Sequence, residues 1–183
     1  MSNKRVLVAI ANGSEEIEAV TVIDVLRRAG LEVTVASVET DCSIVASRGV
    51  RLQADCLIDA CVGPFDLIVL PGGMPGAERL RDSQPLITLL QQQREQGRAY
   101  AAICAAPAVA LLPHGLLQQH SATAHPAFID QLPADVRSEA RVVVDGRCIT
   151  SRGPGTALEF ALALVSELLG AEVAAQVAAP MVV

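Results

Sequence analysis

The sequence predicts one α/β domain, in which helices cover both faces of a mostly parallel sheet. Short aliphatic runs alternate with helical stretches along the 183 residues, which is the rhythm of β–α–β units. The runs at 5–11 and 66–70 are almost continuously apolar, as in strands that are buried on both faces. Aromatic residues make up only 2% of the chain, so aliphatic side chains must fill the core. A chain of this length can bury such a core without disulfides.

The first half of the chain contains most of the predicted strands. We expect strands at 5–11, 32–37 and 66–70, a helix at 15–29, and short β-like pieces around Ile44 and Leu52. Acidic residues in the first turn of the helix complement its dipole, and Gly30 is placed to end it.

The second half combines helices with a hairpin. We expect helices at 84–96, 105–112 and 156–169, a strand at 99–103, a hairpin at 142–150 and a short last helix from Glu172. Asp145-Gly146 is a favoured hairpin turn. Thr156 and Glu159 have the spacing of a capping box at the start of the third helix.

Composition excludes several classes of function. The net charge is −6, with no run of five basic residues, so binding to a nucleic-acid backbone is not expected. The five cysteines are odd in number and contain no C-x-x-C pair, which disfavours a disulfide framework or a zinc site. No signal peptide or membrane-spanning run is evident. We therefore expect a cytoplasmic protein without a metal or a cofactor.

Cys104 is the first candidate for chemistry. In open parallel sheets, ligands bind beyond the carboxyl ends of the strands, and Cys104 directly follows the predicted strand 99–103. A sharp turn into a helix would expose the sulfur, and the helix N-terminus would lower the pKa of the thiol. The alternative is a buried structural cysteine, a common fate of this residue.

Two other segments should reach the same edge of the sheet. Glu18 lies one turn into the first helix, where burial would raise the pKa of its carboxyl and let it donate a hydrogen bond to the sulfur. A solvated glutamate is the simpler alternative. Gly72 and Gly73 end a strand, where backbone N–H groups can stabilise an oxyanion or merely form a tight turn.

Three basic side chains complete the candidates. His125 precedes a proline and is therefore expected to be extended. It could act as an acid or base, although a lone histidine is more often structural. Arg152 could bind an anion together with Arg48, unless both are simply solvated.

Several motifs occur in the order typical of one family. They are N-G-S-E-E-I-E at 12–18, L-P-G-G at 70–73, A-A-I-C-A-A-P at 101–107, H-P at 125–126, S-R-G-P-G-T at 151–156 and A-A-Q-V-A-A-P at 174–180. Together they resemble the ThiJ/PfpI superfamily, in the branch of bacterial YajL and the human Parkinson-disease-associated deglycase. The resemblance spans the whole chain, as a single class I glutamine amidotransferase-like domain, 1–183.

The resemblance implies a flavodoxin-like three-layer sandwich that forms homodimers. It implies Cys104 as the nucleophile, a protonated Glu18 bonded to its sulfur, and His125 nearby. Gly73 and Ala105 would supply oxyanion-hole N–H groups. The intracellular-protease branch has a histidine where this chain has Ala105, which weakens a peptidase triad.

Three functions follow as alternatives. The first is a cysteine-dependent deglycase or cofactor-independent glyoxalase, acting on methylglyoxal, glyoxal or glycated proteins in oxidative-stress defence. The second is a non-enzymatic redox-sensing chaperone that responds to oxidation of Cys104. The third is a cysteine peptidase or amidase, for which His125 is the one plausible activating histidine.

Overall fold

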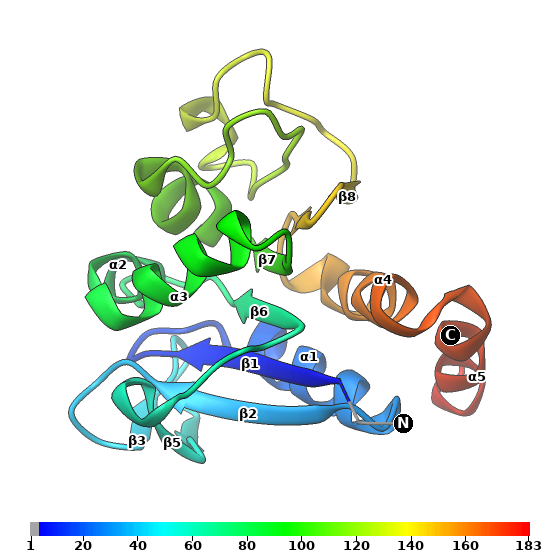
Figure 1. The fold of residues 1–183 in the computed structure, drawn as a ribbon, viewed down its shortest axis with the longest axis horizontal. Coiled ribbons are helices and arrows are strands. Elements are labelled where there is room, and N and C mark those ends of the chain that lie inside the picture. The colour runs from blue at the N-terminus through cyan, green and yellow to red at the C-terminus, as the bar shows by residue number, and fades with distance from the viewer. Residues whose placement is uncertain (1–3) are drawn as a thin grey trace.

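A computed structural model describes residues 4–183 and has a seven-stranded sheet in the order β5-β2-β1-β6-β7-β9-β8 (Figure 1). The strands are β1 Arg5–Ile10, β2 Glu32–Ser37, β5 Cys56–Leu57, β6 Leu67–Leu70, β7 Ala99–Ile103, β8 Val142–Asp145 and β9 Cys148–Ser151. Neighbouring strands are parallel, except that the edge strand β8 runs antiparallel to β9. A separate hairpin joins β3 Ser43–Val45 to β4 Arg51–Gln53.

Helices cover both faces of this sheet. They are α1 Glu16–Arg28, α2 Gly76–Asp82, α3 Gln84–Glu95, α4 Ala157–Leu169 and α5 Ala171–Ala178. On one side α1 packs against α4, and α4 against α5; on the other, α2 lies beside α3 and a helical segment at 107–111 (Figure 1). The predicted flavodoxin-like sandwich with a mostly parallel sheet and one β-hairpin is therefore confirmed.

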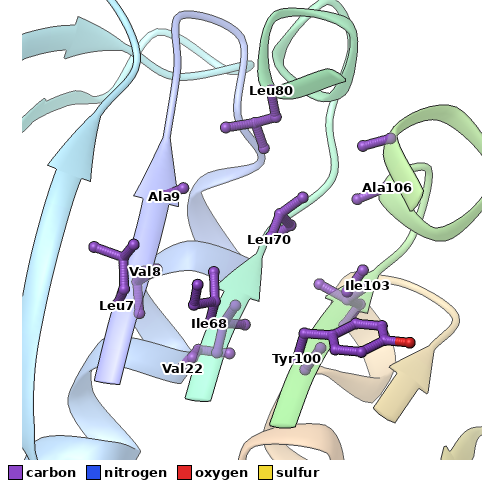
Figure 2. Close-up of a cluster of buried hydrophobic side chains, with 14 of the residues drawn as sticks. Leu7, Val8, Ala9, Val22, Ile68, Leu70, Leu80, Tyr100, Ile103 and Ala106 are labelled. Atoms are coloured by element: carbon purple, nitrogen blue, oxygen red, sulfur yellow. The ribbon is translucent and has the colours of Figure 1, made fainter. Parts of the chain in front are cut away.

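The hydrophobic core lies on both faces of the three central strands, β1, β6 and β7. Figure 2 shows Leu7 and Ile68 on β1 and β6, with Val22 of α1 and Leu80 of α2 packed around the sheet. Every residue of β6 and β7 is buried. Continuous apolar runs are needed here because helices exclude water from both faces of the strands.

Most predicted elements are confirmed to within one or two residues at their ends. Gly30 and Gly97 follow the ends of α1 and α3 with φ of 77° and 63°. In this left-handed region glycine has no Cβ penalty, which is why both helices stop there. In the part of the chain that is described, no helix is long and apolar enough to cross a membrane. The first three residues, where no targeting segment is predicted, lie outside the described range.

Two local predictions are wrong. Asp145 pairs with Cys148 in the hairpin, so the turn residues are Gly146 and Arg147 rather than Asp145-Gly146. The capping box is absent at α4, because the Thr156 hydroxyl accepts a hydrogen bond from the Gly153 N–H and also bonds Ser151.

Other segments differ from the prediction because they are too short to show a clear hydrophobic pattern in the sequence. Helix α2 was not predicted: it has seven residues and begins at a glycine. Strand β5 has only two residues. The predicted helix at 105–112 is a π-helical segment at 107–111 followed by a 3₁₀ turn at 112–114. Such local variants of the helix are common near functional sites.

Candidate active site

Cys104 lies on a sharp turn directly after β7. Its φ is +67°, a left-handed conformation that a non-glycine residue adopts only where the surrounding structure enforces it. Two backbone hydrogen bonds hold the turn, from Cys104 N to Ser151 O at 2.9 Å and from His125 N to Cys104 O at 2.8 Å. The sharp strand-to-helix turn that the sequence predicts is therefore present.

Gly72 allows the turn at Cys104 to lie close to the end of β6. A Cβ at position 72 would lie 2.6 Å from the Cys104 Cβ and 2.9 Å from the Ala105 nitrogen. Atoms cannot approach so closely without displacement of the backbone. A glycine at this position is therefore a steric requirement of the site.

Glu18 is fully buried on the first turns of α1. Its Oε2 accepts a hydrogen bond of 2.7 Å from the Gly72 N–H. Glu15 caps the same helix, because its Oε2 accepts a bond of 2.8 Å from the Glu18 N–H. Burial raises the pKa of Glu18 to about 7, against 4.5 in solution. The alternative of a solvated glutamate is thus wrong, since burial disfavours its charged form.

The carboxyl of Glu18 lies close enough to the sulfur of Cys104 for each group to shift the pKa of the other. Burial and the charge of an ionised Glu18 raise the pKa of Cys104 to about 12. While Glu18 is ionised, the helix terminus is therefore not sufficient to lower the pKa of the thiol, contrary to the expectation from the sequence. The helical segment is short, and the side chain is 8% exposed, so burial is the larger effect.

Two backbone N–H groups also act on the sulfur. They belong to Gly73 and Ala105, and both lower the pKa of Cys104 because they favour its charged form. They come from different strand ends, since Gly73 follows β6 and Ala105 follows β7. The ends of two parallel strands and one helix thus meet at a single sulfur atom.

An open cavity of about 270 Å³ lies against Cys104. Its walls combine apolar and polar side chains: Glu15, Ser47, Arg48, Gly73, Met74, Ala105, His125, Phe128 and Pro154. The site therefore has room for a small molecule beside the sulfur.

Comparison with known proteins identifies the family. The model of the DJ-1/PfpI family matches residues 4–167. The chain belongs to the DJ-1/PfpI family. The resemblance of the sequence to the ThiJ/PfpI superfamily is thereby confirmed.

Two curated relatives and one solved structure illustrate the similarity. Protein DJ-1 homolog B of Arabidopsis thaliana is 48% identical over 99% of this chain, which spans only 42% of that plant protein. Glutathione-independent glyoxalase DJR-1.2 of Caenorhabditis elegans is 39% identical, over 87% of this chain and 85% of that protein. The structure titled "Toxoplasma gondii DJ-1, oxidized" has a TM-score of 0.97 and 53% identity, over 98% of both chains.

The three basic candidates of this DJ-1/PfpI chain line two neighbouring cavities. Arg48 and His125 line the cavity at Cys104, whereas Arg152 lines the adjoining one, which shares His125 and Pro154. The two arginines are therefore not brought into a common cavity. The His125 ring accepts a hydrogen bond of 3.1 Å from the Ala127 N–H through Nδ1.

The sequence did not indicate Met74 and Phe128, which line the cavity of the DJ-1/PfpI site. It indicated Gly72 as a candidate, but not the hydrogen bond by which the Gly72 N–H fixes the carboxyl of Glu18. These contacts join distant parts of the chain, so no local sequence pattern predicts them. Among residues 4–183, no cluster of three or more His, Cys, Asp or Glu side chains is arranged to hold a metal ion.

Proposed function

We propose that this protein is a cysteine-dependent glyoxalase and deglycase, which acts on methylglyoxal or glyoxal and on their adducts with proteins. The convergence of the Glu18 carboxyl and two N–H donors on the Cys104 sulfur, beside an open cavity, carries the proposal. A relative with 39% identity named as a glutathione-independent glyoxalase supports it. Oxidative-stress defence would be the cellular role.

We place the shared proton on Glu18 and the negative charge on Cys104 in the reactive state. Glu18 Oε1 is buried and has no hydrogen-bond partner among the described residues, so a protonated Oε1 is free to donate to the sulfur. The thiolate then accepts three donors, from Glu18, Gly73 and Ala105. A carboxylate at Glu18 would instead leave the N–H groups of Gly73 and Ala105 facing a weakly accepting thiol.

The reaction begins with attack of the thiolate on the aldehyde carbon. A C–S bond forms, the carbonyl electrons move to oxygen, and Glu18 gives that oxygen its proton. The N–H groups of Gly73 and Ala105 stabilise the developing oxyanion. With an aminocarbinol adduct, the same attack breaks the C–N bond, and the amine leaves with the proton.

Proton transfers complete the conversion of the hemithioacetal. Glu18, now ionised, removes the hydrogen of the former aldehyde carbon, and the proton of its hydroxyl group passes to the neighbouring carbonyl oxygen. Glu18 then returns its proton to the adjacent carbon, which gives a 2-hydroxy thioester. Water then adds to the thioester, the C–S bond breaks, and lactate or glycolate leaves. His125 activates this water from the cavity wall. The sum is one dicarbonyl and one water, so no oxidant or cofactor is consumed.

Arg48 and Arg152 are assigned to charge stabilisation in this scheme. Arg48 lines the reaction cavity and is placed to attract a carboxylate product. Arg152 lines the neighbouring cavity and would act on the more distant part of a larger adduct. The substrates are thus small dicarbonyls and glycated proteins.

Lactate production from methylglyoxal tests the proposal. Cys104→Ala should reduce kcat/KM by at least about 10³-fold, because it removes the nucleophile. Glu18→Ala should be strongly impaired as well. Cys42→Ala is the matched control, since Cys42 is half-buried and remote from the cavity lining. Turnover retained in folded Cys104→Ala would refute the proposal.

A redox-sensing chaperone is the second candidate. The N–H groups of Gly73 and Ala105, which favour the charged form of the sulfur, would also stabilise a sulfinate. Client protection that depends on Cys104 oxidation, with no aldehyde turnover, would favour this candidate. The peptidase hypothesis ranks last, because no described hydrogen bond joins the His125 ring to Cys104, and failure to cleave a peptide library would dismiss it.

We also propose a homodimer in the cytoplasm. Ile17 and Val20 on α1 are 54% and 45% exposed, and Val50 at the adjacent hairpin is 47% exposed. Such an apolar area suits burial by a second copy. Sedimentation of an Ile17→Lys variant as a monomer would support this, whereas a monomeric parent protein would refute it. The five free thiols suit a reducing compartment.

A further inference from the structure

Cys56 and Cys61 form a second thiol site that the proposed catalytic chemistry does not use. Their sulfur atoms lie 3.4 Å apart. Cys56 begins β5, and Cys61 ends the single 3₁₀ turn at 58–60. Both side chains are half-buried and therefore accessible to small molecules.

The two thiols are chemically unequal. Burial, a hydrogen bond to Cys56 and the charge of a Cys56 thiolate raise the pKa of Cys61 to about 12, against the opposing effect of Arg5. Cys61 therefore keeps its proton, which it can donate to Leu57 O at 3.7 Å or across the 3.4 Å contact with Cys56. The Arg5 guanidinium is fixed nearby by bonds to Val62 O and Pro64 O. A cation beside a thiol pair favours formation of one thiolate.

The contact distance and the neighbouring Arg5 cation distinguish this pair from the other cysteines. From these observations we propose that Cys56 and Cys61 are a site of reversible disulfide formation by hydroperoxides, separate from Cys104. Strand β5 lies four positions from β7 in the sheet, which corresponds to about 19 Å at the usual strand spacing. Oxidation at the two places is therefore chemically independent.

The reaction balances with one hydroperoxide. The Cys56 thiolate attacks the peroxide, the O–O bond breaks and Cys56 sulfenic acid forms, while the leaving alkoxide or hydroxide takes from solvent the proton that Cys56 released on ionising and departs as alcohol or water. The Cys61 sulfur then attacks the Cys56 sulfur, the S–O bond breaks, and the leaving hydroxide takes the Cys61 proton as water. Rotation of the side chains has to bring the sulfurs from 3.4 Å to about 2.05 Å.

Peptide mass spectrometry under non-reducing conditions tests this assignment. The full chain is treated with equimolar hydrogen peroxide, and the remaining thiols are then alkylated. The peptide that contains Cys56 and Cys61 should lack two hydrogens, resist alkylation, and regain both thiols after dithiothreitol. Cys42→Ser is the matched control, because this half-buried cysteine has no sulfur neighbour among the described contacts, and this variant should retain the disulfide.

Single variants separate the steps. Cys56→Ser and Cys61→Ser should each reduce the disulfide to background, and Cys61→Ser should accumulate a Cys56 sulfenic acid that dimedone traps. Circular dichroism checks that both variants fold, and methylglyoxal turnover, measured in the same samples, reports separately on Cys104. Oxidation of Cys104 while Cys56 and Cys61 both remain alkylatable would overturn the inference. Cross-links to other cysteines alone would overturn it too.

Discussion

At the scale of single residues, the site depends on contacts that force chemical groups together. Cys104 has a left-handed backbone, Gly72 supplies the space beside it, and Glu18 is buried against it. The strand ends predicted from the sequence were sufficient to place Cys104 and Glu18 at the same edge of the sheet. They could not predict the pKa of the thiol, which depends on burial and on the charge of its neighbour.

The steric requirement at Gly72 leads to a prediction about Gly72→Ala. The added methyl would lie 2.6 Å from the Cys104 Cβ, so the turn must shift. We expect a loss of about 1–3 kcal/mol in the free energy of unfolding, as for other overpacked sites. Urea unfolding measures this loss, and the alkylation rate of Cys104 reports the displaced sulfur.

Gly155→Ala is the matched control for that change. A Cβ at position 155 meets no atom within 4 Å, so we expect a change in stability within about 0.5 kcal/mol, as for ordinary surface substitutions. Equal effects of the two substitutions would show that close packing at Gly72 is unimportant.

At the scale of elements, the β3–β4 hairpin is anchored to the start of α1. Glu16 accepts hydrogen bonds of 2.7 Å from the Ser47 hydroxyl and from the Arg48 N–H. The sequence placed Glu16 only as an acid that complements the helix dipole. Its second role depends on a contact more than thirty residues away, which no local pattern encodes. The absent capping box at α4 has a local cause, because the Thr156 hydroxyl bonds to Ser151 and Gly153 in the turn before the helix.

The anchoring predicts a pH-dependent effect of Glu16→Gln. Burial raises the pKa of Glu16, but the bonds from Ser47 and Arg48 outweigh it, so the pKa lies below 4.5. Stability from these bonds is thus present above pH 4.5 and is lost as the pH falls through the lower folded value. We expect Glu16→Gln to cost about 1–3 kcal/mol at neutral pH and progressively less in acid.

Urea unfolding at several pH values, with Glu172→Gln as an exposed control, measures the difference. A cost of Glu16→Gln that does not change between neutral and acidic pH would contradict this account of the anchor.

At the scale of the whole molecule, the parallel sheet brings distant segments to one place. The order β2-β1-β6-β7-β9 is that of doubly wound sheets, in which ligands bind beyond the carboxyl ends near the reversal of strand order. Continuous apolar runs and their alternation with helices were enough to predict this architecture. Elements with little apolar pattern, such as α2 and β5, could not be found in the same way.

The depth of the core predicts a large range of thiol reactivity. Cys148 is fully buried on β9, and burial raises the pKa of its thiol to about 12. Its alkylation therefore requires opening of the sheet, and should be at least about 10³-fold slower than that of Cys42. Mass spectrometry of a time course of alkylation measures both rates in one sample. Similar rates at Cys148 and Cys42 would mean that the sheet opens easily.

The pH dependence of Cys104 alkylation, in the parent protein and in Glu18→Ala, tests the central claim most directly. If a protonated Glu18 donates to the thiolate, the parent midpoint lies below the ordinary cysteine pKa of about 8.5, and Glu18→Ala raises it. Glu18→Gln, which retains a donor, should shift the midpoint less. A parent midpoint above that of ordinary cysteine, which Glu18→Ala lowers, would show that the charge resides on the carboxylate and would contradict the proposed chemistry.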